Sequence, residues 1–254
     1  MNGVRDIIRQ QLAPAGVLKA ALNLSNSLLN KGRDASGQWL GVAPDLARAI
    51  ADRLEVPVEF VPYAKPAEVA AAVHDGEWTI ALIAADPARS GAMAFTAPYS
   101  QIEAAYMVSP GSAITRLADV DRPGIHVAAY KGSAYGLWLE RNLSHAALVN
   151  GATFEEAFDR FRSGEADVLA SLVPRLELDR TAWPGCRILE GLFMTVQQAV
   201  ACRVQDAQAI LFLREFVDAA VRRGWIADLI RAHGVQGLRA AAADGLGVSI
   251  DNVN

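Results

Sequence analysis

The sequence predicts an α/β protein in which parallel strands are joined by helices, and three observations support this prediction. Stretches of alternating or continuous apolar residues, which are typical of strands, alternate along the chain with stretches whose apolar residues recur every three or four positions, which are typical of helices. Hydrophobic residues make up 52% of the chain and charged residues 20%, which is typical of a globular protein. The length of 254 residues allows one large domain or two small ones.

The first series of elements is expected to run β-α-β-α-β over residues 16–83. Its first helix, at 44–54, has one apolar face and one charged face. Its second helix, at 66–74, ends before Gly76, which suits a left-handed cap. The expected strands lie at 16–22, 56–61 and 79–83.

A second βα series follows the apolar run at 104–108, which is typical of a buried strand. Thr153 and Glu156 have the spacing of a capping box, and this spacing predicts a helix start. The expected strands lie at 125–129, 147–149, 166–171 and 187–189, and the expected helices at 133–143, 154–162 and 174–181.

The last part of the chain is expected to hold a strand at 195–202 and helices at 206–223 and 225–233. The Ala- and Gly-rich tail at 235–254 has no strong periodicity, so we expect it to be weakly ordered. Two βα series linked by two apolar runs predict two lobes with a ligand cleft between them. One continuous doubly wound sheet is the alternative.

Charge and cysteine content exclude several classes of protein. With 24 basic and 28 acidic residues the net charge is -4, and no basic run exceeds Arg222-Arg223, so neither nucleic acid nor an anionic membrane surface is expected as a partner. No stretch has 18 or more uninterrupted apolar residues, so direct membrane insertion is not expected either. Cys186 and Cys202 are too few for a disulfide framework and are expected to be structural. The polar segment at 1–12 has no apolar stretch behind it, so no export signal is expected in the chain as given.

Motifs for catalysis, metals and cofactors are missing. The four histidines have no metal-ligand spacing, and no phosphate-binding or dinucleotide-binding glycine motif is present. The segment around Ser133 does not have the spacing of a nucleophile elbow. We therefore expect no metal, no cofactor and no catalytic residue.

One candidate binding cluster is A-A-D-P-A-R at 84–89, directly after an expected strand. Asp86 and Pro87 suit a helix start whose N–H groups would attract an anion. Arg89 is unfavourable to the dipole of that helix, and a bound carboxylate would explain its position. An exposed arginine paired with an acidic side chain is the alternative.

A matching cluster in the second series is Y-K-G-S-A-Y at 130–135. Gly132 allows close approach of the backbone, and Ser133 caps a helix whose N–H groups again favour an anion. An ordinary Gly-Ser helix start is the alternative.

Several motifs along residues 15–233 resemble those of one known family. The matching segments are G-V-A-P-D-L-A at 41–47, D-P-A-R at 86–89 with F-T-A-P-Y at 95–99, K-G-S at 131–133 and G-E-A-D-V at 164–168. They resemble the type II periplasmic solute-binding proteins of ABC importers, in the group that binds polar amino acids (solute-binding protein family 3).

This resemblance implies two lobes, each with a mostly parallel sheet flanked by helices, and a hinge of two segments. Lobe 1 would comprise residues 1–103 and 200–254, and lobe 2 residues 104–199. The resemblance places Arg89 on the ligand carboxylate, with the Ser133 hydroxyl and a neighbouring backbone N–H on the same group. The further implied ligand contacts are Gly132, Ala84, Asp86, Ala134, Tyr135, Asn23 and Leu172.

The chain also departs from the family pattern. The family's acidic residue for the ligand α-amino group falls on Leu172 here, and the Ser/Thr positions before the arginine are Ala84 and Asp86. The aromatic segment after the first strand is replaced by N-L-S-N-S at 23–27. Because a buried ammonium without a counter-charge is costly, a carboxylate lacking the amino group suits Leu172 better than a free amino acid does.

The function expected from this resemblance is capture of a small carboxylate-bearing solute, either an amino acid or its deaminated analogue, and delivery to an ABC permease by a monomeric protein. The resemblance implies a periplasmic location, and the missing export signal leaves a cytoplasmic one as the alternative. Alternative functions on the same fold are a lyase like the cyclohexadienyl dehydratases, with Asp86, Glu103 or Lys131 transferring protons, and an intracellular ligand sensor.

Overall fold

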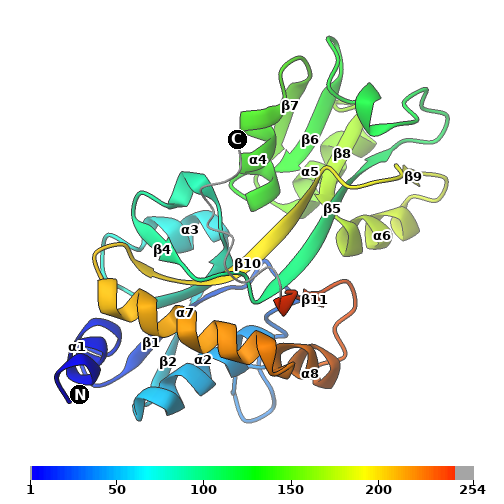
Figure 1. Ribbon diagram of the computed structural model, residues 1–254. Helices are drawn as coiled ribbons and strands as arrows, with labels where there is room; N and C mark the ends of the chain where they lie inside the picture. The colour runs from blue at the N-terminus through cyan, green and yellow to red at the C-terminus, as the bar shows by residue number, and fades with distance from the viewer. Residues whose placement is uncertain (1, 244–254) are drawn as a thin grey trace. The chain divides into compact units, whose positions relative to one another are not determined.

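The computed structural model describes residues 2–243, which form two compact units. Unit 1 comprises the described residues up to Gln101 and those from Gln197 onward, and unit 2 runs from Ile102 to Val196. Two long strands lead from one unit to the other along the chain, namely β5 (Ser100–Val108) and β10 (Met194–Arg203) (Figure 1).

The strands of unit 1 include both parallel and antiparallel pairs. Its strands, besides parts of β5 and β10, are β1 (Leu18–Asn23), β2 (Val58–Tyr63), β3 (Ile80–Ala84), β4 (Met93–Phe95) and β11 (Arg239–Ala240). β1 lies between β2 and β3 and is parallel to both, whereas β10 pairs antiparallel with β3 and β4. The carboxyl ends of β1, β2 and β3 therefore lie at the same edge of the sheet.

The helices of unit 1 pack against its strands or against one another. They are α1 (Asn2–Leu12), α2 (Val42–Leu54), α3 (Pro66–Ala71), α7 (Ala207–Arg222) and α8 (Trp225–Ala232). In α2 the spacing of Leu46, Ile50 and Leu54 puts all three side chains in the core, where each is at most 1% exposed. None of the helices within residues 2–243 is both long and apolar enough to cross a membrane.

The strands of unit 2 pair in the order β5-β8-β6-β7, with β9 on β5. The strands are β6 (His126–Tyr130), β7 (Ala147–Gly151), β8 (Val168–Leu172) and β9 (Arg187–Ile188), and the helices are α4 (Ala134–Asn142), α5 (Phe154–Arg162) and α6 (Val173–Ala182). β6 is parallel to β7 and β8. Here too the carboxyl ends of parallel strands meet at one edge.

The predicted α/β class is confirmed, and α5 has the predicted bounds. The prediction for α3 was too long, because the helix ends at Ala71 and a turn containing the left-handed Gly76 follows. Among the α-helices and β-strands within residues 2–243, three were not predicted: α1, β4 and β11. α1 is mostly polar and is held by tertiary contacts, including a 2.8 Å bond from Arg9 Nε to the Leu54 carbonyl and burial of Leu12.

The tail prediction was wrong for residues 235–243. β11 pairs antiparallel with the first residues of β5, and the N–H of Ala241 donates to the Tyr99 carbonyl at 3.0 Å. Leu238 and Ala241 are buried. The rest of the predicted weakly ordered tail, 244–254, lies outside the described residues.

Both cysteines are buried free thiols, as the sequence predicts for structural cysteines. Burial raises the pKa of Cys186 and raises that of Cys202 to about 12. The thiolate, which is the reactive form, is therefore scarce at neutral pH.

The loop after β1 is held against the start of α2 by Gly41, which has a φ of 132°. The N–H of Ala43 donates to the Leu29 carbonyl at 3.1 Å, and a Cβ added at Gly41 would lie 2.2 Å from the same oxygen. Only glycine fits here, because a side chain would force this loop away from the helix.

We expect Gly41→Ala to lower the free energy of unfolding by about 1 to 3 kcal/mol, since the new methyl group overlaps a backbone oxygen. Urea denaturation measures this change. Gly91→Ala is the matched control, because its added Cβ meets no atom within 4 Å, and we expect a change within about 0.5 kcal/mol. Equal stability of the two variants would contradict the role assigned to Gly41.

Candidate functional site

The end of β3 carries the charged part of the candidate site in unit 1. The five residues of β3 are all buried, and the chain then makes one 3-10 turn at Pro87–Arg89. The carboxylate of Asp86 accepts a 2.8 Å hydrogen bond from the Ala88 N–H and so caps this turn. The predicted helix with an anion-attracting start is therefore only a single turn, and Asp86 already occupies one of its N–H groups.

Arg89 is buried at this edge, with an exposed fraction of 6%. Its Nη1 donates to the carbonyl of Ala84 at 2.6 Å. Burial lowers the pKa of Arg89 to about 10, and the charge of Asp86 acts in the opposite direction. The guanidinium is therefore charged at neutral pH, and the alternative of an exposed surface arginine is wrong.

Asn23 lies at the same edge, because β1 and β3 are parallel and Leu22 is opposite Leu82. The Asn23 side-chain oxygen accepts hydrogen bonds from the N–H and the hydroxyl of Ser25, at 3.3 and 2.8 Å. The structure thus brings together four of the predicted residues in unit 1: Asn23, Ala84, Asp86 and Arg89.

Two polar residues on the loop after β1 were not predicted. Asn26 and Asn30 are buried, with exposed fractions of 8% and 5%, and the side-chain oxygen of each has no hydrogen-bond partner among the described residues. Asn30 Nδ2 donates to the Asn23 carbonyl at 2.8 Å and so ties this loop to the end of β1. Asparagine after a strand is a common turn signal, so the sequence alone did not distinguish these two.

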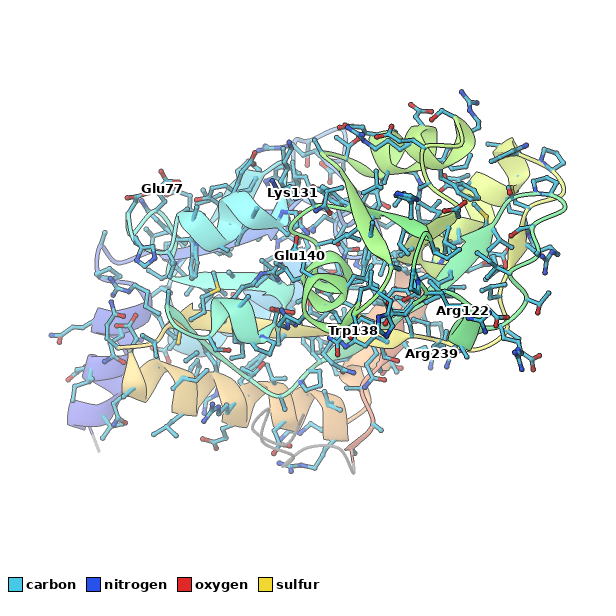
Figure 2. All side chains as sticks on the ribbon, turned by 90° about the horizontal axis from the view of Figure 1, so that it is seen from above. Glu77, Arg122, Lys131, Trp138, Glu140 and Arg239 are labelled. Atoms are coloured by element: carbon cyan, nitrogen blue, oxygen red, sulfur yellow. The ribbon has the colours of Figure 1, made fainter. Side chains whose placement is uncertain are left out.

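In unit 2, Ser133 caps α4 as predicted. Its Oγ accepts a 2.9 Å hydrogen bond from the Gly136 N–H and donates to the Tyr130 carbonyl at 2.7 Å. Gly132 has a φ of 74°, and the exposed Lys131 precedes it at the end of β6 (Figure 2). The Ser133 hydroxyl is thus already engaged within the protein, and the free donors expected here are the first backbone N–H groups of α4, at Ala134 and Tyr135.

Leu172 and Tyr135 complete this edge of unit 2. Leu172 is the last residue of β8 and precedes α6, whose start has no side-chain cap. The Tyr135 hydroxyl lies 3.4 Å from Ser171 Oγ, and burial raises the pKa of Tyr135 above its usual value. The predicted residues of unit 2 lie at the carboxyl ends of β6 and β8, beside two helix starts: Gly132, Ser133, Ala134, Tyr135 and Leu172.

The two sets of residues differ in electrostatic character. Unit 1 supplies a buried cation at Arg89, whereas unit 2 supplies the partial positive charge of helix starts next to an apolar side chain. Both features favour an anion. Within residues 2–243 no group of three acidic, histidine or cysteine side chains could hold a metal ion.

The fold and these two sets of groups are those of a ligand-binding α/β protein. Polar groups and helix starts at the carboxyl ends of parallel strands are the ligand-binding arrangement of α/β proteins. A model of the family described as bacterial extracellular solute-binding proteins, family 3, matches residues 29–232. The chain belongs to this family.

Solved structures with the same fold are mainly amino-acid-binding proteins. The solute receptor for L-cysteine of Neisseria gonorrhoeae is 19% identical, with a TM-score of 0.73 over 93% of this chain and 99% of the receptor. A substrate-binding protein of an amino acid ABC transporter from Streptococcus pneumoniae, bound to L-arginine, is 20% identical, with a TM-score of 0.70 over 92% of this chain and 99% of that one.

A third structure is AncCDT-1, an ancestral amino acid-binding protein described as a precursor of cyclohexadienyl dehydratase. It is 22% identical to this chain, with a TM-score of 0.69 over 88% of this chain and 97% of AncCDT-1. A comparison with curated proteins finds no match. These similarities confirm the two-lobed periplasmic-binding-protein fold that the sequence predicts.

We expect Ser133→Ala to lower the free energy of unfolding by about 1 kcal/mol, because the first turn of α4 loses its cap. Urea denaturation is the measurement. Ser133→Thr keeps a hydroxyl at the same position and should retain most of the stability. If the alanine variant is as stable as the wild type, the cap does not contribute as described.

Proposed function

We propose that the protein binds a small solute through its carboxylate, with Arg89 as the main contact and the first N–H groups of α4 as further donors. The observation that carries this proposal is the burial of Arg89 at a strand end. A carboxylate matches the planar fork of a guanidinium, and burial strengthens charge-assisted hydrogen bonds between the two groups. The helix start at Ala134 and Tyr135 adds N–H donors of the kind that bind oxyanions.

The proposed ligands are amino acids or their deaminated analogues. Support comes from structures of the same fold that are named for L-cysteine and L-arginine. The side chain of Leu172 argues for the deaminated forms, because it is apolar and 9% exposed and lies beside an uncapped helix start. A ligand ammonium next to that start would meet partial positive charge and no counter-charge from residue 172.

We further propose that the protein delivers its ligand to an ABC importer outside the cytoplasm. The family description as extracellular solute-binding proteins supports this role. So does the substrate-binding protein of an amino acid ABC transporter with the same fold. Closure around the ligand would then present the loaded form to the permease.

We also propose that the ligand is bound without chemical change, so that the lyase alternative does not apply. Asp86, one of its proposed proton-transfer groups, is engaged in capping the turn at Pro87–Arg89. Incubation with prephenate and arogenate, followed by mass spectrometry, should give no product. Multiple turnovers that disappear in Asp86→Asn or Glu103→Gln would instead establish the lyase activity.

Arg89→Lys should weaken ligand binding by about 1.5 to 3 kcal/mol, because lysine keeps the charge but loses the two-pronged hydrogen-bonding geometry. Isothermal titration calorimetry measures this loss of affinity. The ligand is the one that stabilises the protein most in a thermal-shift screen of amino acids and their deaminated counterparts. Arg53→Lys, at an exposed position of α2, is the matched control and should bind like the wild type. Unchanged affinity in Arg89→Lys would remove Arg89 from the site.

In the same screen, we expect a deaminated acid to stabilise the wild type more than its amino-acid counterpart does, with stabilisation following RT ln(1 + [L]/Kd). Leu172→Asp should shift the preference toward the amino acid, because the new carboxylate pairs with the ammonium. Aspartate is also a favourable cap for α6, so this variant should fold. Leu172→Asn, which caps without charge, is the control. A wild-type preference for the amino acid contradicts the role of Leu172.

A further inference from the structure

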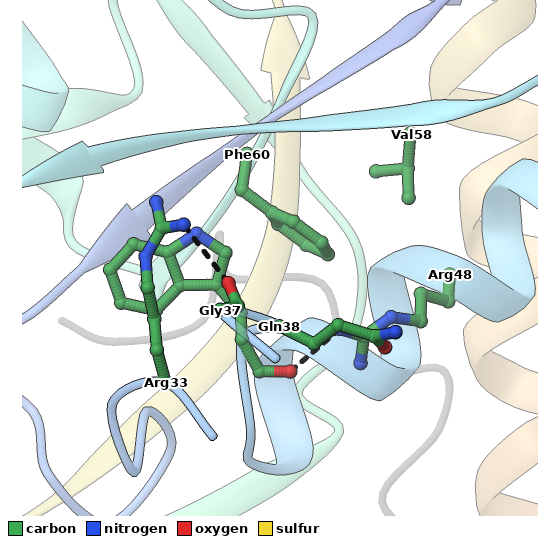
Figure 3. A pocket seen from close by; sticks show the side chains of 7 residues that line it. Arg33, Gly37, Gln38, Arg48, Val58 and Phe60 are labelled. Carbon is green, nitrogen blue, oxygen red and sulfur yellow. Dashed lines mark hydrogen bonds between the residues drawn. The ribbon is translucent and has the colours of Figure 1, made fainter. Parts of the chain in front are cut away.

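A second pocket lies in unit 1, beside the edge strand β2 and away from the strand ends that carry Arg89. It has a volume of about 350 Å³, at the lower end of the range for small-molecule sites. We name it the Arg33 pocket, and its lining residues are Arg33, Gly37, Gln38, Trp39, Arg48, Val58 and Phe60 (Figure 3).

The loop that forms one wall of the Arg33 pocket is rigidly built. Residues 31–40 form a hairpin in which Arg33 and Trp39 pair across the two arms. The Asp34 carboxylate accepts hydrogen bonds from the N–H and hydroxyl of Ser36, at 2.8 and 2.6 Å, and from the Gln38 N–H at 2.9 Å. These hydrogen bonds lower the pKa of Asp34, and the bond from the Ser36 hydroxyl has the largest effect. The Asp34 carboxylate therefore stabilises the turn.

Two guanidinium groups border the Arg33 pocket, and each lies over an aromatic ring. The Arg33 guanidinium is 4.3 Å from the centre of the Trp39 ring, and that of Arg48 is 5.2 Å from the centre of Phe60. Arg48 pairs with Asp45 at 2.7 Å and donates to the Trp39 carbonyl at 2.6 Å. These two partners within the protein hold its side chain in place.

Arg33 is less fully engaged than Arg48. Its Nη1 donates to the Gly37 carbonyl at 3.0 Å, and no carboxylate within residues 2–243 forms an ion pair with it. A guanidinium has several N–H donors in one plane, so an edge of Arg33 is left to bind an oxyanion. The stacking on Trp39 holds this edge in place.

The remaining wall of the Arg33 pocket is apolar. Val58 and Phe60 occupy alternate positions of β2 and therefore face the same side of the sheet. Both are only partly buried by the protein itself. A flat ring lying on this wall would remove apolar surface from water while its acid group reached Arg33.

We propose that the Arg33 pocket is a second binding site, which takes a small aromatic carboxylate. The Arg33 guanidinium disfavours an amine, and the apolar wall gives a ring-bearing acid an advantage over a bare inorganic anion. The proposal does not depend on the function proposed for Arg89, because the lining residues of the two sites are different.

The test uses benzoate as the probe, with the full chain. Benzoate titration should shift the indole N–H signal of Trp39 in a nitrogen–proton NMR spectrum, with a Kd on the order of 1 mM for a ligand of this size. Trp39→Phe assigns the signal. Benzylamine and inorganic phosphate should bind at least about tenfold more weakly, since each lacks one of the two required features.

Arg33→Gln should weaken benzoate binding at least about tenfold, whereas Arg53→Gln, which removes the same charge from an exposed position of α2, should leave it unchanged. Arg89→Lys should also leave the Trp39 shift unchanged. The proposal is overturned if benzoate gives no saturable shift, if Arg33→Gln and Arg53→Gln act equally, or if phosphate binds as well as benzoate. Loss of the shift in Arg89→Lys would assign benzoate to the other site and overturn it as well.

Discussion

The burial of one guanidinium, that of Arg89, is the constraint on which the candidate site depends. An interior cation is tolerated only where nearby groups compensate for its lost hydration. Here the carbonyl of Ala84 accepts from Arg89, and the charge of Asp86 acts in favour of the charged form. Both partners are available because β3 ends at Ala84 and Asp86 then caps a tight turn begun by Pro87. The end of a strand, a capping residue and a proline together place the cation at the edge of the sheet.

At the carboxyl ends of its parallel strands, unit 2 supplies positive charge through the backbone and not through a side chain. The partial charge comes from the helix starts that follow β6 and β8. The close packing around α4 requires a glycine at 136, because a Cβ there would lie 2.6 Å from the Tyr130 carbonyl. Side chains in this unit therefore act mainly by shaping the backbone, whereas in unit 1 a side chain carries the charge.

Sequence patterns predicted the fold where local signals agreed with burial. α2 and α5 were predicted because their apolar spacing matches the faces that they bury. α1 and β11 were missed because partners distant in the chain hold them, through Leu54 in one case and β5 in the other. Arg89 could be singled out because a strand, a cap and a proline precede it. The Arg33 pocket could not, since it exists only after a hairpin folds over β2.

The two buried thiols have a consequence for how the protein can be handled. Neither Cys186 nor Cys202 forms a disulfide, and burial keeps both in the protonated form at neutral pH. Folding therefore needs neither an oxidant nor a reductant, and the same native state is compatible with either environment. Because both native thiols are buried and protonated, maleimide reagents should react little with them. A single cysteine introduced on the surface would carry a fluorophore or spin label at a known position in an otherwise unmodified chain.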